Sequence, residues 1–360
     1  MTLSWIFNRG PGTVFSKEFV PHLHLIKTIT LLLAITCTQV LATTPGKVVG
    51  GKSFDTPAWF KDSFLEIADD VDDATESGKH VLLFFHLNGC PYCAQTVNEQ
   101  FQKEPLRSFM QEHFDSIEIN VRGDREIAMT EEITTTERLL AEYLKIQGTP
   151  TIILLNSKNQ VVLRLAGYRS TRALQQAFNY VQQMAYLETS FGDYKRANMQ
   201  YGEYQFIANP LIETVSDFSS IREPVALLIE DDDCDDCATF HNKLISRAEI
   251  REQLEQYRFI RINGKSEQLI TDFNGRRISP EDWTAELKMD YRPGIILFDE
   301  GKEVARVASL LFPFHFEHLL RYGLNKNYLK YSRYGELMRA RQEELFAQGI
   351  DTNVGKPDDW

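Results

Sequence analysis

The sequence has 360 residues, enough for about two domains of ordinary size. With 43% hydrophobic and 25% charged residues, it has the composition of a globular protein whose core does not need disulfides for stability. The formal net charge of −12 argues against a nucleic-acid partner, because binding to phosphates rewards clustered Lys and Arg.

The N-terminal segment predicts an export signal. Lys27 precedes an apolar run from Ile29 to Ala42, which ends in the small-residue cleavage pattern Val40-Leu41-Ala42. A membrane span needs about 20 apolar residues, so residues 1–42 are interpreted as a cleaved signal peptide, with an uncleaved membrane anchor as the alternative. Cleavage would remove Cys37 and deliver the other four cysteines to the periplasm, an oxidising compartment.

Residues 57–187 have the pattern of an α/β domain. Continuous apolar runs of strand length alternate with segments of helical spacing, which predicts a mixed sheet flanked by helices. The predicted helices are Trp59–Ala74, Pro91–Gln100, a helix opened by a Thr134/Glu137 capping box, and a closing helix marked by Leu174 and Phe178; the predicted strands are His80–His86, Phe114–Val121, Thr151–Leu155 and Val161–Ala166.

Residues 206–325 repeat this pattern. Cys234 lies 144 positions after Cys90, and Pro293 lies 143 positions after Pro150, so the two halves share one register. The sequence therefore predicts a tandem duplication, with linkers at 43–56 and 188–205 and a charged surface helix and tail at 326–360. The predicted elements of the second half are a helix at Asn209–Ile221, strands at Val225–Ile229 and Tyr257–Ile262, a helix opened by Ser279-Pro280, a hairpin of Ile295–Phe298 with Val304–Val307, and a closing helix at Phe314–Tyr322.

Cys90 and Cys93 form a Cys-x-x-Cys pair between a predicted buried strand and a helix. The helix N-terminus stabilises a thiolate by roughly 0.3–2 kcal/mol. Such placement predicts an exposed Cys90 that attacks and a buried Cys93 that resolves the mixed disulfide. The alternatives are a structural disulfide and a zinc site. Zinc is disfavoured because its paired thiolates normally lie about 15–20 residues apart, so no metal site is predicted.

The Cys90-Pro91-Tyr92-Cys93 motif, the strand before it and Thr149-Pro150 resemble the thioredoxin superfamily over about residues 59–186. The resemblance implies two tandem thioredoxin-like domains, each a central mixed β-sheet flanked by helices. It also implies a cis bond before Pro150, with Thr149 and Pro150 offering backbone groups to a substrate beside Cys90. Phe84 and Gly89 depart from the family, which usually has a buried aspartate and a tryptophan at these positions.

A closer resemblance is to the SoxW-type periplasmic thioredoxins of sulfur-oxidising bacteria. It implies a cofactor-free thiol–disulfide oxidoreductase with a reducing role. The implied partners are protein thiols or disulfides, sulfur-oxidation carrier proteins among them, and a membrane electron donor. A disulfide isomerase or oxidase, and a non-catalytic binding or chaperone module with structural disulfides, are the alternatives. The motifs that carry this resemblance are Trp59–Phe64, Phe84–His86, Gly89–Cys93, Gly123–Glu126, Asp272–Arg277 and Gly349–Asp351.

The second pair, Cys234 and Cys237, is set among five aspartates between positions 231 and 236. Their charge predicts a raised pKa for the Cys234 thiol. The run lacks the ligand alternation of a calcium loop and is interpreted as a solvated acidic turn. Arg292 stands before Pro293 and is expected to crowd the groove. Cys234, Cys237 and Pro293 are therefore predicted to form a secondary redox or structural site, and Cys90 to react before Cys234. His86 is expected to end its strand rather than to tune a thiolate.

Overall fold

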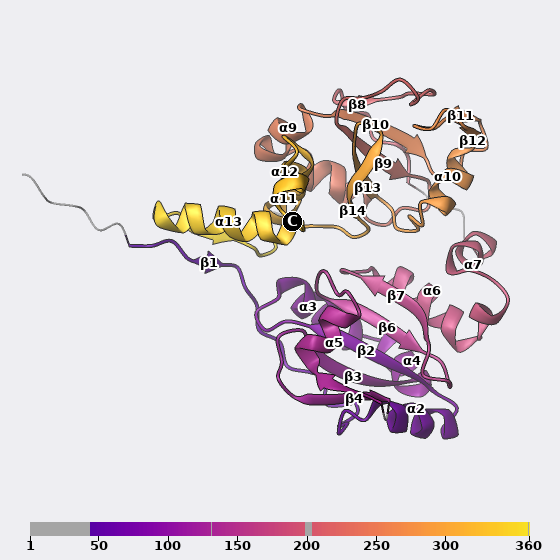
Figure 1. The fold of residues 1–360 in the computed structure, drawn as a ribbon. Helices are drawn as coiled ribbons and strands as arrows, with labels where there is room; N and C mark the ends of the chain where they lie inside the picture. The colour runs from indigo at the N-terminus through magenta and orange to yellow at the C-terminus, as the bar shows by residue number, and fades with distance from the viewer. Residues whose placement is uncertain (1–43, 131, 199–203, 359) are drawn as a thin grey trace, which may run out of the picture. The chain divides into compact units, whose positions relative to one another are not determined.

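The computed structural model describes residues 44–130, 132–198, 204–358 and 360. The predicted signal peptide, including Cys37, lies outside these residues. The described chain contains two main β-sheets flanked by helices (Figure 1). Among the described residues, none of the helices is both long enough and apolar enough to cross a membrane.

The first sheet has the strand order β3-β2-β6-β7. β2 and β3 are parallel, whereas β6 pairs antiparallel with both β2 and β7. All four predicted strands are confirmed. The elements of this domain are β2 (His80–His86), β3 (Phe114–Asn120), β6 (Thr151–Leu155), β7 (Val161–Ala166), the small hairpin β4 (Glu126–Thr130) and β5 (Ile133–Thr136), and helices α2 (Ile67–Glu76), α3 (Pro91–Thr96), α4 (Leu106–His113), α5 (Glu137–Tyr143) and α6 (Thr171–Gln182), with a π-helical turn η1 (Val97–Phe101) that prolongs α3.

β2 is buried on both faces, as its continuous apolar run predicts. Side chains alternate across a strand, so Leu82 and Phe84 enter one apolar core while Val81, Leu83 and Phe85 enter the other. This central strand ends at His86, just before the first cysteine pair.

The second sheet has the order β14-β13-β9-β10-β8. β10, β9, β13 and β14 correspond in order and direction to β3, β2, β6 and β7 of the first sheet. β8 is an added edge strand, parallel to β10. The tandem arrangement is thus present in the fold. The elements are β8 (Ile212–Glu213), β9 (Val225–Glu230), β10 (Arg258–Asn263), β13 (Gly294–Asp299), β14 (Lys302–Val307), the short pair β11 (Ile270–Thr271) and β12 (Arg277–Ile278), helices α8 (Cys237–Thr239), α9 (Ala248–Leu254), α10 (Pro280–Glu286) and α11 (Pro313–Gly323), and the π-helical turn η3 (Phe240–Leu244).

The helix predicted at Asn209–Ile221 is wrong. This segment contains only β8, whose backbone pairs with Phe259 and Ile260 of β10. Pro210 interrupts helical hydrogen bonding, and Glu213 forms an ion pair with Arg258 that holds the segment at the sheet edge.

Two helix starts in the first half also need correction. α2 begins at Ile67 rather than near Trp59, because Leu65 has a positive φ of 64° that breaks helical geometry. The predicted capping box at Thr134 is wrong, since this residue lies in β5. Thr136 caps α5 instead, by accepting a hydrogen bond from the backbone of Leu139. The helix α4 was not predicted.

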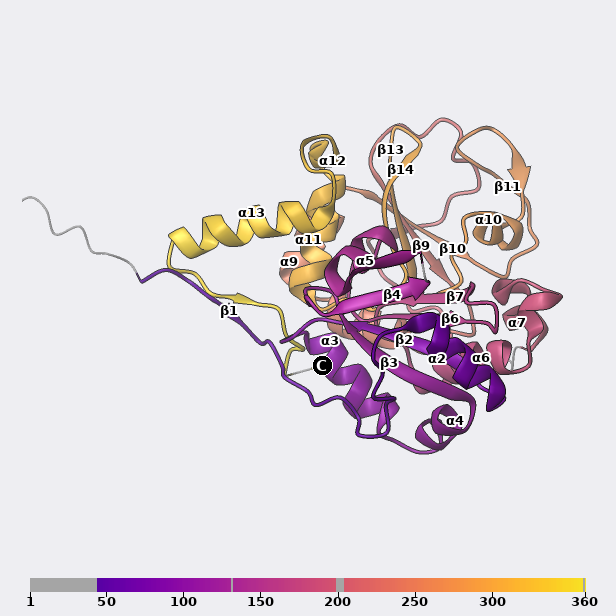
Figure 2. The same cartoon turned by 60° about the horizontal axis from the view of Figure 1, so that its bottom comes forward.

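The segments outside the two domains also contain helices and strands among their described residues. The predicted linker 188–205 contains the helix α7 (Phe191–Ala197), which follows the short helix η2 (Ala185–Leu187). Near the N-terminus, β1 (Val48–Val49) pairs with β15 (Thr352–Asn353), so the two end segments lie side by side in Figures 1 and 2. The predicted C-terminal helix is confirmed as α13 (Tyr334–Ala347); it packs on α11 and follows the short helix α12 (Asn327–Lys330).

Candidate redox site

Cys90 and Cys93 form a disulfide at the start of α3. The turn after β2 uses Gly89 at a positive φ of 76° to deliver Cys90 to the N-cap position. Pro91 follows as the first helical residue, where its fixed φ suits the helix. The Cys90 sulfur accepts a hydrogen bond from the backbone N–H of Cys93 at 3.1 Å. A negative charge on this sulfur would therefore be stabilised by the helix N-terminus.

The structure brings the predicted substrate loop against this disulfide. The Thr149–Pro150 bond is cis, as the sequence resemblance implies. The Thr149 hydroxyl donates a hydrogen bond to the Cys90 sulfur at 3.3 Å, and the Thr149 carbonyl oxygen lies 3.6 Å from the same sulfur. Cys90, Cys93, Thr149 and Pro150 thus form one cluster, although Thr149 lies 59 positions from Cys90.

Cys90 is less accessible than its position predicts. Cys93 is fully buried, as expected, but Cys90 is only 6% exposed. The reason is that residues of the second domain cover the motif: Phe312 belongs to the same apolar cluster as Cys90 and Tyr92. The prediction of an exposed first sulfur is therefore wrong for this arrangement of the chain.

Tyr92 contacts both Phe312 and His315 of the second domain, although its place in the motif predicts no such role. Its ring stacks on Phe312 with a centroid distance of 4.2 Å. Its hydroxyl accepts a hydrogen bond from the Phe312 backbone N–H at 2.7 Å and lies 3.1 Å from Nδ1 of His315. Burial lowers the pKa of His315 to about 4, so this imidazole is neutral at pH 7 and Nδ1 can accept the Tyr92 proton. No motif in the sequence links Tyr92 to residues more than 200 positions away.

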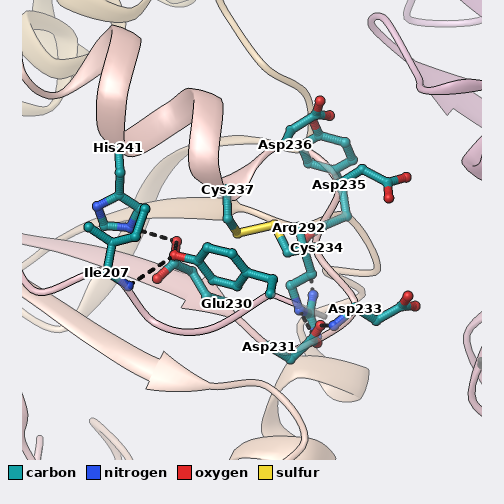
Figure 3. The surroundings of a disulfide bond; sticks show 12 residues. Ile207, Glu230, Asp231, Asp233, Cys234, Asp235, Asp236, Cys237, His241 and Arg292 are labelled. Carbon is teal, nitrogen blue, oxygen red and sulfur yellow. Dashed lines mark hydrogen bonds and ion pairs between the residues drawn. A yellow bond between two sulfur atoms is a disulfide. The ribbon is translucent and has the colours of Figure 1, made fainter. Parts of the chain in front are cut away.

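Cys234 and Cys237 form the second disulfide, in a different backbone setting (Figure 3). α8 begins at Cys237 with Asp236 as its N-cap residue, so Cys234 precedes the helix rather than capping it. Cys234 therefore lacks the N-cap position that Cys90 occupies. Asp235 stands where the first domain has Pro91, and it lacks the fixed φ that favours helix initiation.

The aspartates around this disulfide are paired, not a solvated turn. Arg292 binds Asp231 at 2.7 Å instead of crowding the groove, and Lys265 pairs with Asp232. The carboxylates of Asp233, Asp235 and Asp236 point away from the sulfur atoms in Figure 3. Their partners come from other segments: Arg172 for Asp233 and Asp235, and the Tyr291 hydroxyl for Asp236.

Pairing removes much of the basis for a raised Cys234 pKa, because each neighbouring cation offsets a carboxylate. Asp231 and Asp233 are nearly buried, at 4% and 9% exposure. Burial raises the pKa of Asp236 above its ordinary value.

A buried polar group on the other side of the second disulfide was also not predicted. Glu230 ends β9 and is fully buried. It accepts a hydrogen bond from His241 at 2.8 Å (Figure 3). Tyr204 and Arg261 also donate to it, each at 3.3 Å. The equivalent strand end in the first domain is His86.

His86 faces a carboxylate of its own sheet. It ends β2, as expected, and its Nε2 lies 2.8 Å from Glu118. Contact with His86 and with the Thr56 hydroxyl lowers the pKa of Glu118 to about 2. The side chain that His86 contacts here is thus a carboxylate, not a cysteine. Within the described residues, His, Cys, Asp and Glu side chains form no group of three or more that could hold a metal ion.

Comparison with known families settles the fold. A thioredoxin-like domain family matches residues 67–182 and again residues 213–324, which together make up more than half of the chain. The chain belongs to the thioredoxin-like family. A search of curated proteins finds no match.

Solved structures of thioredoxin-fold proteins resemble single domains of this chain. A thioredoxin-fold protein from Helicobacter pylori is 21% identical, with 37% of this chain and 95% of that chain covered and a TM-score of 0.31. A thioredoxin from Thermus thermophilus is 24% identical over 32% of this chain and 83% of that chain, with a TM-score of 0.26. A disulphide isomerase from Xylella fastidiosa is 15% identical over 37% and 94%, with a TM-score of 0.24.

Two thioredoxin-like domains, each with a Cys-x-x-Cys disulfide, support thiol–disulfide redox chemistry at a general level. Such chemistry requires a thiolate. Cys90 is better placed than Cys234 to form one, because it occupies a helix N-cap and its sulfur accepts a hydrogen bond from the Thr149 hydroxyl.

Proposed function

We propose that this protein is an exported thiol–disulfide oxidoreductase that reduces disulfides in partner proteins through Cys90 and Cys93. The observation that carries the proposal is the position of Cys90, at the N-cap of α3 and in contact with Thr149 beside the cis-proline loop. This arrangement stabilises a thiolate and places it next to backbone groups that a substrate strand can bind.

The proposed reaction conserves electrons and protons. The Cys90 thiolate attacks one sulfur of a partner disulfide, forms a Cys90–partner bond and releases the other partner sulfur, which takes up a proton. Cys93 then loses its proton and attacks the Cys90 sulfur, which closes the Cys90–Cys93 disulfide and releases the second partner thiol. Two electrons pass from the dithiol to the partner.

The location and the partners are part of the proposal. The apolar run Ile29–Ala42 supports export to the periplasm. An oxidising compartment would require a source of electrons for the active dithiol, and a membrane electron donor would meet that need. Sulfur-oxidation carrier proteins are proposed as substrates on the strength of the sequence motifs.

Reduction of insulin disulfides by dithiothreitol tests the proposal. The wild-type chain should accelerate the reaction, and Cys90→Ser should reduce the rate to that of dithiothreitol alone. The double variant Cys234→Ser/Cys237→Ser is the control, and we expect it to keep most of the activity. Near-normal turnover by Cys90→Ser would exclude Cys90 as the nucleophile.

A further inference from the structure

The loops beside the two disulfides face each other across the contact between the domains. In the first domain, the loop after β7 joins the cis-proline loop, because the backbone N–H of Gly167 donates to the carbonyl of Pro150 at 2.7 Å. A Cβ at Gly167, whose φ is 85°, would collide with the side chain of Ser309 in the loop after β14. The equivalent loops of the two domains therefore touch each other directly.

The contacts on either side of this point are related by the repeat. Asp236 lies 144 positions after Tyr92, and Phe312 lies 143 positions after Arg169. On one side, Tyr92 of the first motif stacks on Phe312 at 4.2 Å. On the other side, Asp236 of the second motif binds the Tyr291 hydroxyl at 2.5 Å, and the Arg169 guanidinium covers the Tyr291 ring at 4.6 Å.

A second pair of contacts follows the same relation. His315 lies 143 positions after Arg172. His315 meets the first motif through Tyr92, and Arg172 meets the second motif through Asp235 at 2.6 Å. Ser170 adds a hydrogen bond to Asp235 at 2.6 Å. Each domain thus contacts the cysteine motif of the other with the same loop and the first turn of the helix that follows it.

Both first cysteines are covered by this arrangement. Cys90 is 6% exposed and Cys234 is 8% exposed, whereas the second cysteine of each pair is fully buried. Both cysteine motifs contribute residues to the contact between the domains, Tyr92 from the first and Asp235 from the second.

We propose that the two disulfides exchange electrons with each other within one chain, so that the Cys234/Cys237 pair is an internal partner of Cys90/Cys93. This inference rests on the proposed function of Cys90. In the step, the Cys90 thiolate attacks the Cys234 sulfur, the Cys90–Cys234 bond forms, and the Cys234–Cys237 bond breaks. Cys237 leaves as a thiolate and takes up a proton.

The second half of the exchange restores the first disulfide. Cys93 loses its proton and attacks the Cys90 sulfur, which forms Cys90–Cys93 and releases the Cys234 thiolate to be protonated. Two electrons and two protons move from the first dithiol to the second pair. The reverse reaction returns these electrons and protons. External partners that react with Cys90 can therefore also reduce or oxidise the second pair.

A trapping experiment on the full chain tests the exchange. The variant Cys93→Ser/Cys237→Ser, with Cys37→Ser to remove the remaining thiol, keeps only Cys90 and Cys234. We expect mild oxidation to join them in most chains as a disulfide within the monomer, identified by peptide mass mapping. The matched control Cys93→Ser/Cys234→Ser, which keeps Cys90 and the buried Cys237, should form far less of such a bond.

A kinetic measurement complements the trap. When the oxidised chain receives one equivalent of dithiothreitol, rapid alkylation and mass spectrometry should show that Cys90→Ser slows reduction of Cys234–Cys237 at least tenfold. The proposed exchange would be overturned by two results together. Cys90→Ser would leave the rate of Cys234–Cys237 reduction unchanged, and the folded Cys93→Ser/Cys237→Ser chain would keep two free thiols after oxidation. Insulin reduction separates the two proposals: if Cys234→Ser/Cys237→Ser still reduces insulin while the trap fails, the proposed function stands and the internal exchange does not.

Discussion

At the scale of single residues, Cys90 and Cys234 hold equivalent places in the repeat but have different surroundings. Cys90 caps a helix and receives the Thr149 hydroxyl. Cys234 precedes its helix, and Arg292, which replaces Thr149, binds Asp231. The difference between the two sites thus comes from hydrogen bonds and helix position more than from the charge of the aspartates.

This difference predicts the order of alkylation. In the reduced chain at pH 7, iodoacetamide should label Cys90 several times faster than Cys234, because a helix N-terminus stabilises a thiolate by roughly 0.3–2 kcal/mol. Mass spectrometry of the labelled peptides gives both rates in one sample. Equal or faster labelling of Cys234 would contradict the ranking.

Tyr92 offers a test of the contact that covers Cys90. Tyr92→Phe leaves the buried Phe312 N–H without its acceptor, which should cost about 1–3 kcal/mol. We expect a lower Tm and faster alkylation of Cys90. Tyr180→Phe is the matched control, since it removes a hydroxyl that donates to the Thr189 carbonyl in the segment directly after the first domain. An unchanged Cys90 labelling rate in Tyr92→Phe would show that this residue does not hold the cover in place.

At the scale of elements, the sequence predicts strands better than helix starts. The segment His80–His86 is a continuous apolar run of strand length, which predicts a central buried strand, and β2 confirms it. The start of α8 at Cys237 could not be predicted by analogy with α3. Asp235 and Asp236 stand at the positions of Pro91 and Tyr92, and they bind Arg172 and Tyr291 from other segments. Those long-range partners leave no local signal in the sequence.

The first turn of α11 carries a pH-sensitive group. Burial lowers the pKa of His315 from its usual 6.5 to about 4. The unfolded chain therefore binds a proton between pH 6.5 and 4 that the folded chain does not, so stability is complete above about pH 6.5 and falls as the pH drops towards 4. Protonation would also remove the acceptor for the Tyr92 hydroxyl.

We expect the free energy of unfolding to fall by at most about 2 kcal/mol between pH 7.5 and pH 5 through His315. Urea unfolding of the wild type and of His315→Gln at both pH values measures this share. The variant should lose less stability on acidification than the wild type does. Identical losses in the two chains would mean that His315 titrates normally.

At the scale of the whole molecule, the tandem fold was predictable and the contact between its halves was not. The intervals from cysteine to proline differ by one residue, 60 from Cys90 to Pro150 and 59 from Cys234 to Pro293, and this match predicts a duplicated domain. The contact depends on Tyr92, Arg172 and Phe312, which lie in three separate segments and match no motif. The sequence therefore predicts an accessible Cys90, whereas in the structure Cys90 is buried in a cluster that includes Phe312 of the second domain.

The central claim is that Cys90 forms the covalent bond to substrate, and trapping that bond tests it most directly. The chain with Cys93→Ser, in a background where Cys234 and Cys237 are also Ser, cannot resolve the adduct or pass it to the second pair. After reduction and incubation with insulin, peptide mass mapping should find one stable mixed disulfide per chain, at Cys90. The absence of any adduct in this folded variant, while the wild type reduces insulin, would contradict the account.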